Sequence, residues 1–301
     1  MKTKRSKNGA ARLGFSLLDL LVVVGVLFLL ACVLLPALSI ARQRTQSERC
    51  LNNLHQLTTA WLMYATANSD RCANNFGVAQ TAASPIQSWC SDNMDWAANT
   101  GDTNLNLLRM GQLAPYTGGD TTHFKCPADT YLSPVQVSAG FKYRLRSYSM
   151  SAFFGLFSNG REGSDPTYQG KNYFDNNYRQ FIKVTDVAQP SVMFVFLDEH
   201  PDSINDGYYD VGDIPTTWTA TTLGTFGDVP ASFHNSGCNF SFSDGHVELH
   251  QWQDLRGAGR SGPGIAGLPV IYASQGEIFD TRPFSDIHWV WAHSSVPFSN
   301  P

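Results

Sequence analysis

The chain has 301 residues, of which 43% are hydrophobic and 15% are charged, and its formal net charge is −4. This composition excludes a disordered or collagen-like chain, and the lack of a basic surplus argues against nucleic-acid binding. The charge is unevenly distributed. The first fourteen residues carry five basic side chains and no acid, whereas the other 16 basic side chains accompany all 25 acidic ones. This asymmetry indicates a removable leader or a chain divided between two compartments.

An uncharged apolar run from Leu20 to Leu38 follows the basic tip. Its length approaches the roughly 20 residues with which a helix crosses the hydrocarbon core of a bilayer. It also lacks the polar stripe that a helix on the surface of a soluble protein keeps. Because the basic residues precede it, the positive-inside rule places residue 1 in the cytoplasm and the following residues outside.

Three patterns compete to explain how this segment is processed. Residues 39–41, Ser-Ile-Ala, offer the small-x-small site of a secretory signal. Residues 29–32, Leu-Leu-Ala-Cys, look like a lipobox that would make Cys32 a lipidated terminus. Neither pattern accounts for Asp19, because an acid inside a membrane segment is costly and is normally paired or functional.

The third pattern is Gly-Phe-Ser-Leu-Leu-Asp-Leu-Leu at residues 14–21. It resembles the cleavage and methylation motif of type IV prepilins and type II secretion pseudopilins. The resemblance implies cleavage after Gly14, methylation of Phe15 and a helix kink at Pro36. It also implies that Asp19 pairs in the membrane with the N-terminal amine of a neighbouring subunit. Aspartate replaces the family's usual glutamate, so this carboxylate is one methylene shorter.

The same resemblance implies partners and a location. The partners are a prepilin peptidase/methyltransferase and other pilin-like subunits, with no nucleic acid. The chain would be a single-pass protein of the inner membrane, with a periplasmic head that is extracted into a filament.

The expected fold is α+β and pilin-like, with a long N-terminal helix packed on a mainly antiparallel β head. Apolar residues after the membrane segment recur at steps of three and four, which is the helical period. We expect four parts: a leader at 1–14, a transmembrane helix at 15–41, an amphipathic helix at 42–68 and a β-rich head at 69–301. The periodic residues are Leu51, Leu54, Leu57, Trp61 and Tyr64.

Strands are predicted in the head where short apolar runs lie between turn residues. Residues 191–197 read as a buried strand, and residues 239–243 and 246–252 as the arms of a hairpin. Asp244 and Gly245 lie between these arms, and Asp-Gly favours a two-residue type I′ turn.

His234, nine further residues and Asp244-Gly245 form an H-x9-DG element. It resembles an element of prepilin-like proteins abundant in planctomycetes and verrucomicrobia. That resemblance supplies no chemistry for His234 or Asp244, and we expect the pair to stabilise the hairpin. Four other segments look like the same family: residues 50–54, 125–129, 146–150 and 197–207.

Two segments, one rich in acids and one with histidines, are candidates for metal sites. Residues 198–213 hold six carboxylates and no Lys or Arg, and calcium would relieve their repulsion. The EF-hand spacing fails at Ile204, so a solvated acidic loop is favoured over bound calcium. His246, Glu248 and His250 could ligate zinc, but we favour the interpretation that they form the solvent-facing side of a hairpin. The calcium candidates are Asp198, Glu199, Asp202 and Asp206.

Five of the six cysteines follow the membrane segment, where an oxidising compartment permits disulfides. We expect Cys72 to pair with Cys90, and Cys50 to pair with Cys126. The sequence does not fix this connectivity. Cys32 is interpreted as a small apolar residue of the membrane segment.

No nucleophile motif such as Gly-x-Ser-x-Gly is present. The sequence therefore predicts a structural, non-enzymatic subunit without a cofactor, calcium excepted. The alternative is a membrane-anchored carbohydrate-binding module or hydrolase that shares only the export segment, with an aromatic sugar platform. The platform would draw on Trp89, Trp96, Trp218, Trp289 and Trp291.

Overall fold

A computed structural model describes residues 17–158, 165–219, 222, 224–253, 265–273, 278–280 and 286–298, with the backbone alone at 39 and 278–280. The chain divides into two compact units, Met1–Gln43 and Arg44–Pro301. The expected leader, Gly14 and Phe15 lie outside the described residues.

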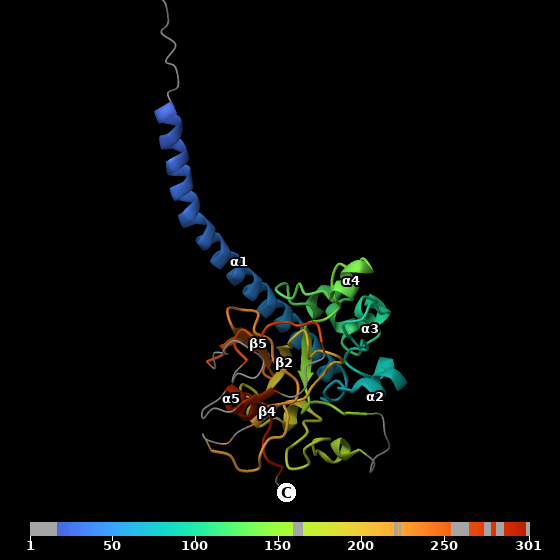
Figure 1. Ribbon diagram of the computed structural model, residues 1–301. Coiled ribbons are helices and arrows are strands. Elements are labelled where there is room, and N and C mark those ends of the chain that lie inside the picture. Colours follow the sequence, from blue (N-terminus) through green and yellow to red (C-terminus); the bar gives the residue numbers. More distant parts are fainter. Residues whose placement is uncertain are drawn as a thin grey trace, which may run out of the picture. The chain divides into compact units, whose positions relative to one another are not determined.

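Helix α1 (Leu17–Ala67) begins in the first unit and continues through Pro36 without a break. The large apolar side chains between Leu17 and Ile40 are exposed. This part of the helix is long and apolar enough to cross a membrane, and Asp19 lies in its first turn. The expected long apolar N-terminal helix is therefore confirmed (Figure 1).

The part of α1 in the second unit is amphipathic. Leu54, Leu57 and Trp61 are fully buried there, whereas Leu51 and Tyr64 are half-buried. The buried stripe follows the expected period because residues three and four apart share one helix face. The helix ends at Ala67, one residue before the end expected for the amphipathic segment.

The main sheet of the second unit has five strands in the order β3-β1-β2-β5-β6. Neighbouring strands are antiparallel except β1 and β3, which are parallel. An α+β fold is confirmed, with a mixed sheet. The strands are β1 (Tyr148–Ser151), β2 (Phe194–Asp198), β3 (Tyr208–Tyr209), β5 (Gly237–Phe242) and β6 (Val247–Gln251).

Strand β2 lies between β1 and β5 and is buried along its whole length. Its aromatic residue Phe194 packs edge-on against Phe240 of β5, with 5.2 Å between ring centroids. The buried strand expected at 191–197 is thus present, shifted by one to three residues. A second, two-stranded antiparallel sheet pairs β4 (Gly224–Phe226) with β7 (Ile278–Asp280).

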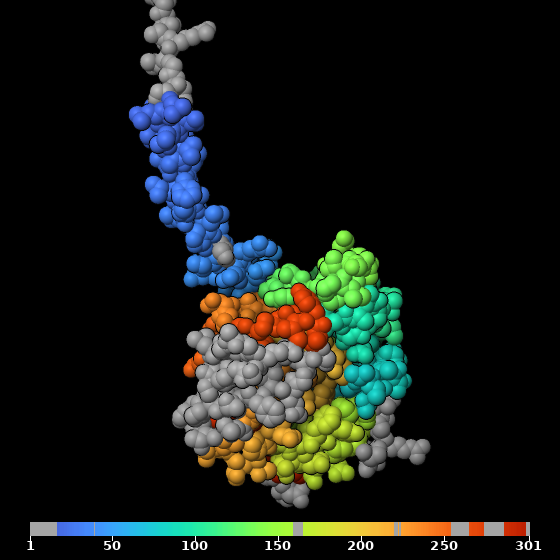
Figure 2. Space-filling view, viewed as in Figure 1, coloured from blue at the N-terminus to red at the C-terminus, as the bar shows by residue number. Residues whose placement is uncertain are grey.

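Residues 72–147 correct the expectation of a β-rich head, because this segment forms only short helices and loops. Figure 2 shows it, in teal to green, gathered on one side of the second unit. Capping side chains satisfy backbone N–H groups at the start of four of these short helices, as in the capping box of Ser133 and Gln136. The helices are α2 (Val78–Ala83), η1 (Pro85–Gln87), η2 (Thr100–Asp102), α3 (Leu105–Arg109), η3 (Ala114–Thr117), η4 (Thr121–Phe124) and α4 (Pro134–Ser138).

Three further helices follow among the residues that the structure describes. Two are single 3-10 turns, and the last is a helix near the C-terminus that the sequence did not predict. They are η5 (Pro166–Gln169), η6 (Val184–Asp186) and α5 (Asp286–Ala292).

Candidate functional site

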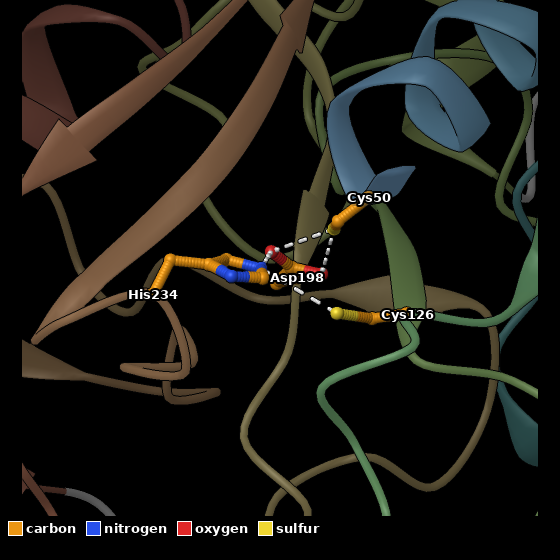
Figure 3. Close-up of side chains that lie close together, drawn as sticks. All are labelled: Cys50, Cys126, Asp198 and His234. Carbon is orange, nitrogen blue, oxygen red and sulfur yellow. Dashed lines mark hydrogen bonds and ion pairs between the residues drawn. The ribbon is translucent and has the colours of Figure 1, made fainter. Parts of the chain in front are cut away.

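Four buried side chains from four separate segments converge in the second unit (Figure 3). Cys50 comes from α1, Cys126 follows η4, Asp198 ends β2, and His234 precedes β5. Their exposed fractions are 0%, 0%, 0% and 3%. One donor atom from each side chain lies within 4.8 Å of all the others. We call this group the Cys–His–Asp cluster.

The Asp198 carboxylate is the centre of the contacts within the cluster. Cys50 Sγ lies 3.1 Å from Asp198 Oδ1 and 3.3 Å from Oδ2. His234 Nε2 lies 3.2 Å from Asp198 Oδ2, and Cys126 Sγ lies 3.4 Å from the same imidazole nitrogen. The two sulfurs, the ring nitrogen and the carboxylate therefore face one another across a small volume.

The buried face of α1 fixes Cys50, since it lies one helical turn before the buried Leu54. The loop that carries Cys126 is held by a salt bridge of 2.5 Å between Lys125 Nζ and Asp129 Oδ2. Asp129 also accepts a hydrogen bond of 2.7 Å from Ser147 Oγ, next to β1. The Lys-Cys-Pro-Ala-Asp segment thus positions its own cysteine.

A sharp turn presents His234. Asn235 and Ser236 have φ angles of 54° and 64°, in the left-handed region that few non-glycine residues adopt. The turn lies between His234 and β5, and His234 N donates to Gly237 O at 3.3 Å. Within β5, Asn239 N donates to Asp198 Oδ2 at 3.2 Å. The same strand therefore follows the turn that presents His234 and hydrogen-bonds to Asp198.

Two neighbouring side chains support the cluster. Tyr148 Oη donates to Cys50 Sγ at 3.2 Å. Cys238 Sγ donates to the backbone oxygen of Asp198 at 3.2 Å. Both residues are fully buried, so the donor atoms of the cluster are enclosed by protein groups with matching hydrogen-bonding capacity.

The surroundings shift two pKa values. Burial, the hydrogen bond with Cys126 and the charge of Asp198 raise the pKa of the Cys50 thiol well above its usual range. Burial alone would lower the pKa of His234, but its contacts with Asp198 and Cys126 outweigh that effect and raise the pKa to about 10. In the protein alone, His234 is therefore an imidazolium beside Asp198, and the Cys50 thiol is neutral.

The two halves of the H-x9-DG element lie at opposite ends of β5 and do different things. His234 joins the cluster, whereas Asp244 Oδ1 accepts a hydrogen bond of 3.0 Å from His246 N in the turn after the strand. The element therefore spans β5 without bringing His234 and Asp244 together.

The turn itself differs from the expected type I′. Phe242 N donates to His246 O, and Gly245 N donates to Phe242 O, so three residues, 243–245, form the loop. Gly245 has a φ of 98°, whereas Asp244 is absent from the residues with positive φ. A type I′ turn needs positive φ at both central residues. A three-residue loop needs only one, which Gly245 supplies.

The acidic stretch 198–213 is not the solvated loop that we expected, because its first four acids are buried. Each accepts hydrogen bonds from a different part of the protein, so the calcium candidates do not form one group. Among the described residues, the Cys–His–Asp cluster is the one set of three or more such side chains close enough to share an ion. The donors are Cys50 and His234 for Asp198, Ser149 and Ser203 for Glu199, the backbone N–H groups of Ile271 and Tyr272 for Asp202, and the backbone N–H of Tyr208 for Asp206.

The histidines of the hairpin also have other neighbours. His246 stacks on Phe242 with 4.2 Å between ring centroids, and His250 stacks on Trp289 at 3.9 Å. Glu248 is exposed. The structure does not gather His246, Glu248 and His250 into a zinc site.

All six cysteines are free thiols in the structure, which forms neither expected disulfide. Cys72 and Cys90 are both buried, but they have different acidic neighbours. Burial is the largest cause that raises the pKa of each thiol. Asp186 and Asp70 raise the pKa of Cys72 further, whereas Asp92 and Asp206 raise that of Cys90. The structure does place Cys50 and Cys126 close together, since both belong to the cluster.

The tryptophans named for a sugar platform do not form one exposed row. Trp89 and Trp291 are buried, and Trp96 and Trp289 are half-buried. Only Trp218 of the five is exposed, at 38%. Their main role is packing.

The sequence singled out all four cluster residues but assigned them to three different sites. One signal in the sequence could have grouped them. Each of the four lies in a segment that resembles prepilin-like proteins: residues 50–54, 125–129, 197–207 and the H-x9-DG element. No family model, no curated protein and no solved structure matches this chain.

Proposed function

We propose that the chain is a structural, non-enzymatic pilin-like subunit of a type II secretion or type IV pilus-like filament. One observation carries the proposal: a single helix, α1, is apolar and exposed over its first part and amphipathic over its second. A subunit that is stored in a membrane and stacks through its helices needs both properties.

The proposed sequence of events begins with insertion, the basic leader remaining in the cytoplasm. A prepilin peptidase then cuts after Gly14 and methylates Phe15, as the motif at 14–21 suggests. Extraction from the inner membrane into a filament follows, with the second unit periplasmic. Asp19 would set the register by pairing with the N-terminal amine of a neighbouring subunit, because an ion pair lowers the cost of a charge in lipid.

The mature N-terminus tests the processing step. We expect the intact mass and N-terminal peptide of the membrane-extracted protein to identify N-methyl-Phe15. A lipidated Cys32 would contradict the proposal and indicate a lipoprotein. A terminus at Arg42 would indicate a freely secreted protein and would contradict it equally.

Substitution of Asp19 tests the assembly step. We expect Asp19→Ala to insert into the membrane at the normal level but to be missing from filaments sheared from cells that carry the assembly machinery. Asp19→Glu, which keeps the charge, is the matched control and should be incorporated. Normal incorporation of Asp19→Ala would rule out the assigned role of this carboxylate.

A further inference from the structure

We propose that Cys50, Cys126, Asp198 and His234 bind one zinc ion in a closed structural site. The site is independent of the proposed filament role, since all four residues belong to the second unit. It joins α1 to the sheet through residues that are up to 184 positions apart in the chain.

The spacing of the donor atoms fits a tetrahedral ion. With Zn–S bonds of about 2.3 Å and Zn–N or Zn–O bonds of about 2.0–2.2 Å, tetrahedral angles separate the ligand atoms by about 3.3–3.8 Å. Cys50 Sγ lies 3.1 Å from Asp198 Oδ1, Cys126 Sγ lies 3.4 Å from His234 Nε2, and one donor atom from each side chain lies within 4.8 Å of the other three. Shifts of about an ångström or less bring these atoms to tetrahedral spacing around an ion.

The donor types select the metal. Two sulfurs and an imidazole nitrogen suit zinc, whereas calcium and magnesium take oxygen ligands. Four protein ligands complete the tetrahedron and leave no position for a water molecule, which is the arrangement of a structural site. The burial of all four side chains agrees with that role.

Neighbouring groups are placed to support the ligands. Asn239 N donates to Asp198 Oδ2, so this oxygen stays hydrogen-bonded while Oδ1, whose contact is with the Cys50 thiol, binds zinc once that thiol has lost its proton. Tyr148 Oη donates to Cys50 Sγ, which stabilises a thiolate. Such outer contacts orient ligands and tune their affinity for the metal.

Zinc binding releases protons from the ligands and needs no oxidant. Each thiol releases its proton to solvent as its S–Zn bond forms, and the His234 imidazolium also releases its Nε2 proton and then coordinates as the neutral imidazole. Two thiolates and one carboxylate then face a divalent cation, so the site carries one net negative charge. That charge is enclosed by the hydrogen-bond donors described above.

Two other states of the same residues make different predictions. A disulfide between Cys50 and Cys126 would remove both sulfur ligands and two hydrogen atoms from the chain mass. A metal-free cluster would keep two free thiols beside the His234–Asp198 pair. The test must therefore measure metal, thiol state and mass on the same sample.

The first experiment uses the full chain, purified in detergent through a tag that binds no metal. We expect elemental analysis to find about one zinc per chain and non-reducing peptide mapping to find Cys50 and Cys126 without a disulfide. Replacement of zinc by cobalt(II) should give the visible absorption of a tetrahedral ion and a sulfur-to-cobalt charge-transfer band. These measurements need no variant, so misfolding of a variant does not affect them.

Variants then locate the ion. Cys50→Ser, Cys126→Ser, Asp198→Asn and His234→Gln should each lower zinc to below about a tenth of an equivalent or weaken its retention against a chelator at least 10-fold. Cys90→Ser is the matched control, because Cys90 is an equally buried thiol that does not belong to the cluster. It should keep its zinc.

Three results would overturn the proposal. One is a Cys50–Cys126 disulfide. Another is a metal-free chain that takes up no zinc after reduction and addition of zinc. The third is zinc that persists in all four variants. None of them bears on the methylated N-terminus, so a failure here is distinct from a failure of the proposed function.

Discussion

Cys126 Sγ lies 3.4 Å from His234 Nε2, although 108 positions separate the two residues in the sequence. The contact depends on two local devices: the Lys125–Asp129 salt bridge that holds the cysteine loop, and the left-handed pair that turns the chain after His234. Closing so long a loop is costly in entropy. Both devices hold the two ends of that loop in place in the folded chain.

Tyr148 provides the first prediction. Tyr148→Phe removes the hydroxyl that donates to Cys50 Sγ at 3.2 Å and should weaken zinc binding about 10-fold, since the thiolate loses a hydrogen bond. Competition against a chromophoric chelator measures the affinity.

The matched control for this change is Tyr209→Phe. Tyr209 is equally buried in the same sheet, but its hydroxyl has no hydrogen-bond partner. It should leave zinc affinity unchanged. Equal effects of the two substitutions would show that Tyr148 acts only through packing.

The second prediction separates the halves of the H-x9-DG element. Gly245→Ala places a Cβ on a backbone with a φ of 98°, which costs about 1–2 kcal/mol of stability. The nearest atom would be Leu62 Cδ1 at 3.4 Å, an ordinary contact, so the cost is conformational. Thermal unfolding in detergent should show a lower Tm.

Zinc content is the second readout for Gly245→Ala. It should stay at the wild-type level, because the turn lies at the opposite end of β5 from His234. Loss of zinc in this variant would show that turn and cluster form one unit. Gly245→Asn is a milder change for comparison, since asparagine tolerates positive φ better than alanine.

The periodic helix and strand could be predicted from the sequence, whereas the convergence of distant residues in the cluster could not. The stripe of Leu54, Leu57 and Trp61 and the apolar run of β2 have periods that one face of a helix or a buried strand requires. The cluster has no such period, because Cys50, Cys126, Asp198 and His234 come from four segments and meet only through the sheet order. Spacing along the chain carries no information about that order.

The acidic stretch was misjudged for a related reason. Six acids without a nearby Lys or Arg look solvated in sequence, whereas the compensating donors come from distant residues. The backbone N–H groups of Ile271 and Tyr272, for example, donate to Asp202, and Ser149 donates to Glu199. Buried acids are tolerated when such partners exist.

The third prediction concerns the buried salt bridge between Arg146 and Asp92. Both side chains are fully buried, with Arg146 Nε 3.0 Å from Asp92 Oδ2. Arg146→Met leaves the carboxylate uncompensated and should lower the unfolding free energy by about 3–5 kcal/mol. Chemical denaturation measures it.

A double substitution tests the same pair. Arg146→Met with Asp92→Leu removes both charges, so the double variant should be more stable than Arg146→Met alone. If the two changes simply add, the charge pair contributes nothing beyond packing.

The fourth prediction is a pH dependence that arises from Asp102. Burial raises the pKa of this carboxyl to about 6, although the backbone N–H of Asp95 and the charge of Arg144 oppose the shift. The folded state therefore holds the proton more tightly than the unfolded state, whose carboxyl titrates near 3.8. Stability should fall as the pH rises from about 4 to about 6, and level off above that.

Asp102→Asn removes this titration. Since each pKa unit corresponds to about 1.4 kcal/mol and the unfolded carboxyl is already partly ionised at pH 4, the unfolding free energy of the variant relative to the wild type should rise by about 2 kcal/mol between pH 4 and pH 7. Asp120→Asn is the control with the opposite sign, because hydrogen bonds from Thr122 lower the pKa of the exposed Asp120. Its stability relative to the wild type should fall slightly over the same range. A difference for Asp102→Asn that does not change with pH would mean that the buried carboxyl ionises in the folded chain as readily as in the unfolded one.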